Sequence, residues 1–160
     1  MHAWNETAVR QIITAHQSMP GALLPILHAI QDATGFIPPD SVPLIAAALN
    51  LSRAEVHGVI TYYHHFRQAP TGTHLLQICR AEACQARGAD ALLAHAIQVL
   101  GCGFHQTTAD GALTLEPVYC LGQCAVGPNI VIGDALHARI TPARLDALLN
   151  PLFESARSTA

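Results

Sequence analysis

Four of the five cysteines in this chain stand in two short clusters, and their spacing constrains the fold more than any other feature. Four residues separate Cys79 from Cys84, and three separate Cys120 from Cys124. Thiolates are soft ligands that bind zinc or iron, and four of them complete either a tetrahedral zinc site or a [2Fe-2S] cluster with two cysteines on each iron. A chain built around such a site must bring together two segments that lie far apart in sequence.

The spacing inside the clusters distinguishes the roles that these cysteines can have. Structural zinc sites most often use Cys-x2-Cys pairs, and the sequence contains none. The same feature argues against a thiol-disulfide catalyst, and the spacing also differs from that of plant ferredoxins. The sequence therefore favours an iron-sulfur cluster held by Cys79, Cys84, Cys120 and Cys124, with structural zinc and free buried thiols as the alternatives.

The composition is typical of a small folded protein that is partly covered by partners. Of the 160 residues, 51% are hydrophobic and only 12% are charged, which allows one domain or two small ones. The net charge is -3, and the 8 basic residues are all arginines, so the chain offers no basic stripe for nucleic acid. The lack of lysine also excludes Schiff-base chemistry and P-loop phosphate binding.

We expect a cytoplasmic chain without a membrane span. The longest apolar run, 42–51, is shorter than the ~18 to 20 residues that cross a bilayer and contains Pro43 and Asn50. The first residues show no basic segment followed by an apolar one, as a secretion signal would require. An odd number of cysteines argues against a disulfide framework and for metal or redox use in a reducing compartment.

The first part of the chain, 1–66, is predicted to be a module of four helices. Apolar residues recur there at helical spacing, and Ser52 with Glu55 forms a capping box, in which each side chain satisfies a free backbone amide at a helix start. The turn-rich stretch 67–73 then indicates a domain boundary. The predicted helices span 1–18, 23–35 and 42–49, and the fourth begins at 52.

Beyond residue 73 the period changes, and alternating strands and helices predict a thioredoxin-like α/β domain over 74–155. Pro117 lies in the second long strand and favours an edge or a bulge, because proline cannot donate a ladder hydrogen bond. The fold class is therefore α+β, a four-helix module followed by a thioredoxin-like domain. Its predicted strands span 74–78, 112–119, 130–132 and 135–139, and its helices span 86–100 and a last segment from Thr141.

This order of elements places both cysteine pairs in loops at one end of the sheet. The first pair lies between the first strand and its helix, and the second pair follows the second long strand. We expect the positive end of the helix after Cys84 to lower the pKa of that thiol. Gly122, Gly127 and Pro128 around the second pair indicate a tight loop whose backbone amides point at sulfur.

The residues around the cysteines resemble a known family of electron-transfer subunits. The frame Cys-x4-Cys and Cys-Leu-Gly-x-Cys, preceded by a helical module ending in 56–66 (VHGVITYYHHF), is similar to the thioredoxin-like [2Fe-2S] ferredoxin subunit of complex I, the NuoE type. This resemblance covers nearly the whole chain. The stretches 79–88 (CRAEACQARG), 101–111 (GCGFHQTTADG) and 114–122 (TLEPVYCLG) are most similar to the gamma subunit of NAD-dependent, molybdenum-containing formate dehydrogenase.

The resemblance implies one [2Fe-2S] cluster, with Cys79 and Cys84 on one iron and Cys120 and Cys124 on the other. It implies a non-catalytic electron-transfer subunit that docks beside a partner that carries FMN and binds NAD. We expect the helical part, 1–66, to make this contact, because its helices carry little charge and end in an aromatic cluster. Further iron-sulfur clusters and molybdopterin would lie in partner subunits, where formate is oxidised and NAD+ is reduced. Complex I and an NAD-linked hydrogenase are the alternative parents, and a zinc-stabilised interaction module is the alternative of another class.

Several other residues could be mistaken for site residues. Cys102 lies outside the matched frame and is expected to be a free structural thiol. His64 and His65 stand among aromatic residues, which favours packing or docking over metal binding. The sequence does not assign a role to His105. Arg80, which follows the first cysteine, is expected to raise the reduction potential of the cluster.

Overall fold

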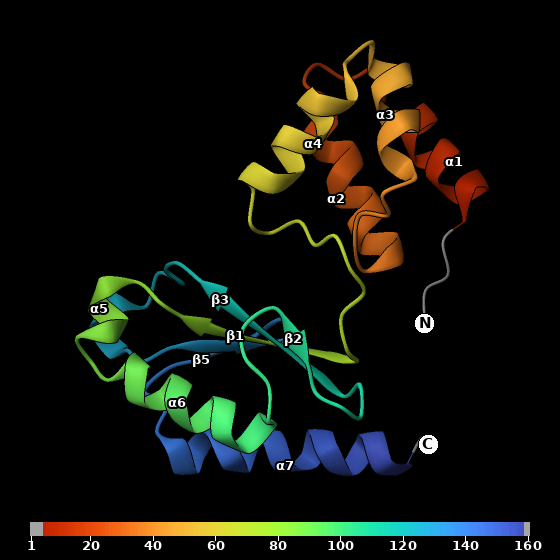
Figure 1. Ribbon diagram of the computed structural model, residues 1–160. Coiled ribbons are helices and arrows are strands. Elements are labelled where there is room, and N and C mark those ends of the chain that lie inside the picture. The colour runs from red at the N-terminus through yellow and green to blue at the C-terminus, as the bar shows by residue number, and fades with distance from the viewer. Residues whose placement is uncertain (1–4, 159–160) are drawn as a thin grey trace. The chain divides into compact units, whose positions relative to one another are not determined.

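The computed structural model describes residues 5–158, which form two compact units that divide between Pro70 and Thr71 (Figure 1). The first unit is helical, and the second combines a sheet with helices, so the α+β class is confirmed. The division falls within 67–73, the stretch rich in turn residues. Among the described residues, no helix has the length and apolar character needed to cross a bilayer.

Four helices build the first unit, as the spacing of apolar residues predicted. They are α1 (Glu6–His16), α2 (Leu23–Thr34), α3 (Ser41–Leu49) and α4 (Arg53–Tyr62). Their inward faces share one apolar core, whose fully buried side chains include Val9, Ile26, Leu27, Ile30, Ile45 and Val56. The first four residues of the predicted first helix lie outside the described part of the chain.

The capping box at the start of α4 is confirmed. Ser52 Oγ accepts a hydrogen bond from the backbone N–H of Glu55 at 3.1 Å. Glu55 Oε2 accepts one from the backbone N–H of Ser52 at 2.8 Å. Two amides that have no partner inside the helix are thus satisfied by side chains, which explains why α4 begins where the sequence indicates.

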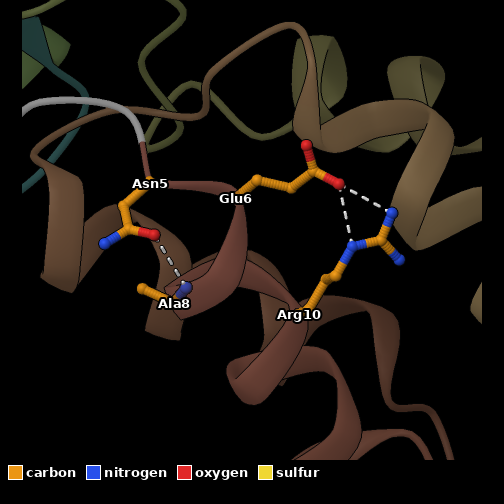
Figure 2. Close-up of polar contacts among 4 residues, drawn as sticks. All are labelled: Asn5, Glu6, Ala8 and Arg10. Carbon is orange, nitrogen blue, oxygen red and sulfur yellow. Dashed lines mark hydrogen bonds and ion pairs between the residues drawn. The ribbon is translucent and has the colours of Figure 1, made fainter.

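The start of α1 is also fixed by side chains, as Figure 2 shows. Asn5 Oδ1 accepts a hydrogen bond from the backbone N–H of Ala8 at 3.2 Å and so caps the helix. Glu6 in the first turn pairs with Arg10 one turn later, with 2.7 Å between Oε1 and Nη2. An acidic residue near the helix N-terminus is favourable because the helix dipole is positive there.

A five-stranded sheet with the order β2-β3-β1-β4-β5 forms the centre of the second unit. The two long strands, β1 and β3, are parallel, and the other pairs are antiparallel. The strands are β1 (His74–Cys79), β2 (Gln106–Thr107), β3 (Leu113–Val118), β4 (Ile130–Ile132) and β5 (Ala135–His137). The helices of this unit are α5 (Glu82–Gln85), α6 (Ala89–Leu100), the 3-10 helix η1 (Cys124–Val126) and α7 (Pro142–Ser158).

Two long helices, α6 and α7, pack side by side against the same face of this sheet (Figure 1). Leucines of both helices and of both parallel strands share one apolar core. The two helices therefore pack against this face of the sheet and hold it in place. The fully or almost fully buried members of this core include Leu76, Ile78, Leu92, Leu113, Leu115, Ile130, Leu145 and Leu149.

The structure corrects three details of the predicted elements. The helix expected over 86–100 begins only at Ala89, because Gly88 has a left-handed φ of 94° and separates it from α5. The short strand β2 was not predicted. Finally, β3 is an inner strand and not an edge strand, yet Pro117 is tolerated because β2 pairs only with Thr114 and Leu115 and ends before it.

Candidate metal centre

The parallel pairing of β1 and β3 brings the two cysteine clusters to the same end of the sheet. Cys79 is the last residue of β1 and lies opposite Val118, the last residue of β3. Cys120 follows two residues later. Because parallel strands that are in register end at the same edge, the loops that leave them meet there. The expectation that both loops share one end of the sheet is therefore confirmed.

The four thiols form two pairs with different exposure. Cys79 and Cys84 are each 1% exposed, and their side chains share a hydrogen bond. Cys120 and Cys124 are exposed, with 3.6 Å between their Sγ atoms. Each pair thus combines a residue at or just beyond the end of a long strand with one from a short helix, α5 or η1.

The buried thiol of Cys79 is surrounded by hydrogen-bond donors from both loops. Burial raises the pKa of this thiol, but hydrogen bonds from the backbone amides of Ala81, Cys120 and Leu121 and from the side chain of Cys84 outweigh burial and hold the pKa below its ordinary value. Donors that face sulfur stabilise the thiolate, which is the form that binds metal. The backbone amides of the second loop therefore help to stabilise the thiolate form of Cys79.

The expected lowering of the pKa of Cys84 is wrong for the free thiol. Burial raises the pKa of Cys84, and the hydrogen bond with Cys79 raises it further. The reason is that Cys84 lies inside the four-residue helix α5 and is buried, so desolvation exceeds any effect of the helix end. The pKa of Cys124 is also raised, first by its hydrogen bond with Cys120 and then by the charge of that neighbour.

The second loop is tight, as Gly122 indicated. Cys120 has a left-handed φ of 84°, and Gly122 has a φ of 79°. The backbone N–H of Gly122 donates to Cys120 Sγ at 3.4 Å, so the expectation of an amide pointing at sulfur is confirmed. Such donors reduce the electrostatic cost of a negatively charged metal-thiolate centre.

Two further residues lie close to the buried pair: Gly127, which the sequence indicated as part of the tight loop, and Asn129, which it did not indicate. A Cβ added to Gly127 would lie 3.0 Å from Cys84 Sγ, so the backbone of this residue approaches the thiol as closely as a glycine allows. Asn129 is 1% exposed, and its Nδ2 lies 3.6 Å from Cys84 Sγ. The only sequence signal for Asn129 is its position just after the second cysteine pair.

The cysteine and histidines that the sequence analysis left out of the ligand set lie in other surroundings. Cys102 is buried in the apolar core of the second unit and donates to the carbonyl oxygen of Gln106 at 3.8 Å, in agreement with a structural thiol. His65 packs against Phe66, with 5.9 Å between ring centroids, which agrees with packing. His105 Nδ1 lies 2.6 Å from Glu116 Oε2. His64 is exposed.

The donor set fits a two-iron cluster. Four sulfur ligands in two pairs can supply two thiolates to each of two irons, and amides from both loops face the sulfurs. The backbone of Gly127 lies close to the buried thiol of Cys84. Within residues 5–158, no three His, Cys, Asp or Glu side chains are placed to hold one metal ion together.

Fold and site together define a thioredoxin-like protein with two cysteine pairs at the ends of its parallel strands. A family model described as thioredoxin-like [2Fe-2S] ferredoxin matches residues 9–152, and the chain belongs to this family. Its cofactor is accordingly a [2Fe-2S] cluster, as the resemblance implied.

Relatives of known name cover most of the chain. It is 37% identical over 139 residues to an NADH-quinone oxidoreductase subunit of Rhizobium meliloti (strain 1021), in a match that covers 87% of this chain and 83% of that protein. It is 35% identical over 137 residues to NADH-quinone oxidoreductase subunit 2 of Thermus thermophilus, covering 85% and 76%. It is 27% identical over 143 residues to the NADP-reducing hydrogenase subunit HndA of Solidesulfovibrio fructosivorans, covering 88% and 84%.

Among solved structures, the chain is similar to a crystal structure of an NAD+-reducing [NiFe]-hydrogenase in the air-oxidized state. The TM-score is 0.68 at 24% identity, and the match covers 95% of this chain. The chain spans only 24% of the length of that hydrogenase chain. At this level of identity the likeness shows the fold.

Proposed function

We propose that this chain is an electron-transfer subunit whose single [2Fe-2S] cluster is bound by Cys79 and Cys84 on one iron and by Cys120 and Cys124 on the other. The observation that carries the proposal is the in-register ending of β1 and β3, which brings these two cysteine pairs to one edge. Family membership supports the cofactor and argues against a zinc-stabilised module.

A bound [2Fe-2S] cluster accepts and releases one electron at a time. The residues of this chain hold the ligands, supply amides to the sulfurs and keep one side of the site dry. Because Cys79 and Cys84 are buried whereas Cys120 and Cys124 are exposed, a redox partner approaches from the side of the second pair. No acid, base or nucleophile is assigned to this chain.

The test of the cluster is the visible absorption spectrum of the anaerobically purified chain before and after dithionite. We expect broad iron-sulfur bands that bleach on reduction, and loss of these bands when any of the four proposed ligands is replaced by serine. Cys102→Ser is the matched control and should keep them, because Cys102 packs in the core of the second unit. A colourless chain with bound zinc would refute the electron-transfer function.

We further propose that the parent complex is an NAD-dependent formate dehydrogenase, which converts formate and NAD+ to CO2 and NADH. The stretches 79–88, 101–111 and 114–122 support this parent, since they resemble its gamma subunit. The partners would be a subunit that carries FMN and binds NAD and, through it, a molybdopterin-containing catalytic subunit with further iron-sulfur clusters. The expected cytoplasmic location stays a prediction.

Complexes of two other kinds are the competing parents. Relatives of 35% to 37% identity bear the name NADH-quinone oxidoreductase, and a relative of 27% identity is a hydrogenase subunit. Affinity purification of the tagged chain from its native cell distinguishes the three. Formate-dependent reduction of NAD+ by the purified complex, together with molybdenum, would support the proposal. Activity with hydrogen alone would instead indicate an NAD-linked hydrogenase, and activity with quinone alone would indicate complex I.

A further inference from the structure

Asn129 contacts both halves of the metal centre although it belongs to neither cysteine pair. It is 1% exposed and directly precedes β4. Its backbone carbonyl accepts a hydrogen bond from the N–H of Cys79 at 3.0 Å. Its side-chain Nδ2 lies 3.6 Å from Cys84 Sγ and 2.7 Å from the carbonyl oxygen of Gln123, the residue before Cys124.

The carbonyl group of Gln123 determines which atom of the Asn129 side chain faces the sulfur. A backbone carbonyl oxygen can only accept hydrogen bonds, so the amide nitrogen and not the amide oxygen must point at it. The NH2 group carries two hydrogens, and the second is directed to Cys84 Sγ. The reversed side chain would place Oδ1 against a carbonyl oxygen and a thiolate, which would repel it.

Packing alone does not explain an asparagine at this position. Its Oδ1 atom is buried and has no hydrogen-bond partner among the described residues. Buried polar atoms are nearly always paired, because an unpaired one loses its hydrogen bonds to water without replacement. A leucine has the same number and branching of side-chain heavy atoms and would not incur this penalty. The side chain therefore leaves its oxygen unpaired in the one orientation that directs its N–H groups at Cys84 and Gln123.

We propose that Asn129 is a positioning residue that donates a hydrogen bond to the Cys84 thiolate and thereby raises the reduction potential of the cluster. One electron passes from a reduced flavin, or from dithionite in the test, to the cluster, and the amide proton stays on Nδ2. The added negative charge makes an N–H dipole at sulfur more favourable after reduction than before. The inference rests on the proposed function, since Cys84 must be an iron ligand.

The test is a potentiometric titration of the full-length, cluster-loaded chain, followed by visible absorption. Asn129→Leu keeps the branched skeleton of the side chain but removes the donor, so we expect its potential to shift below that of the wild type. Asn150→Leu, the same change at an exposed position of α7, is the control and should leave the potential unchanged. A loaded Asn129→Leu chain with the wild-type potential would overturn the proposal.

A second variant, Asn129→Ala, removes both N–H donors without adding a charge or bulk. Its potential should also lie below that of the wild type, which covers the case in which the leucine variant does not load. If neither variant loads iron while the wild type does, the proposal is overturned, because Asn129 would then be needed to form the site rather than to set its potential. A wild-type chain without a cluster would overturn the proposed function as well.

Discussion

Gly127 lies against the buried thiol of Cys84 and leaves little room for a side chain. A Cβ at this position would lie 3.0 Å from Cys84 Sγ and 3.4 Å from Cδ of Arg87. We therefore expect Gly127→Ala to displace Cys84, to lower the iron content of the purified chain and to destabilise it by about 1–3 kcal/mol, as overpacking does. Iron analysis and thermal unfolding measure the two effects.

Gly103→Ala is the matched control for this substitution. Its Cβ would meet Oε1 of Gln106 at 3.6 Å, which is an ordinary contact with a flexible side chain. We expect this variant to keep the wild-type iron content. Equal iron content in the two variants would show that the backbone near Cys84 can yield, and would contradict the role assigned to Gly127.

Arg80 and Asp90 are expected to shift the reduction potential in opposite directions. Arg80 follows Cys79, and its Nη1 lies 2.5 Å from Asp90 Oδ1. Arg80→Gln removes a positive charge and should lower the potential, and Asp90→Asn removes a negative charge and should raise it. The double variant should return close to the wild type. Potentiometric titration measures all three, and two unchanged single variants would mean that solvent screens both charges.

Candidate ligands could be chosen from the sequence because a thiol is identified by residue type and spacing, and the ligand set itself stays a prediction. The pKa of Cys84 could not be predicted, since it depends on burial by residues that are distant in the chain. The contact of Asn129 with Cys84 also spans many residues and has no local pattern. Residue chemistry was therefore predictable, whereas the environment of each residue was not.

The capping box of α4 makes a separate contribution to the helical unit. Ser52→Ala removes the side chain that accepts the Glu55 amide, and we expect it to lower the free energy of unfolding of this unit by about 0.5–2 kcal/mol. Ser18→Ala, in the exposed turn after α1, is the control and should be close to neutral. Thermal unfolding followed by circular dichroism measures both, and equal midpoints would contradict the contribution of the cap.

The same cap should depend on pH. Hydrogen bonds from the backbone and then the side chain of Ser52 hold the pKa of Glu55 below its ordinary value of 4.5. A carboxylate with a lowered pKa stabilises the fold above pH 4.5, and this stabilisation is lost as the pH falls below that value. We expect Glu55→Gln to weaken the acid sensitivity of the helical unit. An unchanged pH dependence of unfolding would contradict this expectation.

The helices of the first unit, the long strands and the hairpin of β4 and β5 were predicted, whereas the strand β2 and the separation of α5 from α6 were not. The helices of the first unit show clear apolar periodicity, and their ends carry caps that can be recognised locally. The strand β2 has only two residues, too few for any period, and exists because β3 pairs with it. The separation of α5 from α6 depends on the left-handed conformation of Gly88, which the sequence permits but does not require.

For the molecule as a whole, we propose that residues 1–66 dock the chain while 74–155 hold the cluster. The apolar core of the first unit draws on residues between Val9 and Phe66, and that of the second on residues between Leu76 and Leu149. Deleting the helical unit should therefore leave a chain that keeps its iron-sulfur absorption. It should no longer co-purify with the flavin subunit, and a truncated chain that still does so would refute the docking role.

Local information was sufficient for the class of the fold, the four helices of the first unit and the four candidate ligands, because periodicity, caps and thiol spacing act over short stretches of chain. The register that sets Cys79 opposite Val118, the burial of one cysteine pair and the orientation of Asn129 depended instead on the folded molecule. These features arise from contacts between distant segments. Their energies are decided only when the sheet forms and water is excluded from one side of the site.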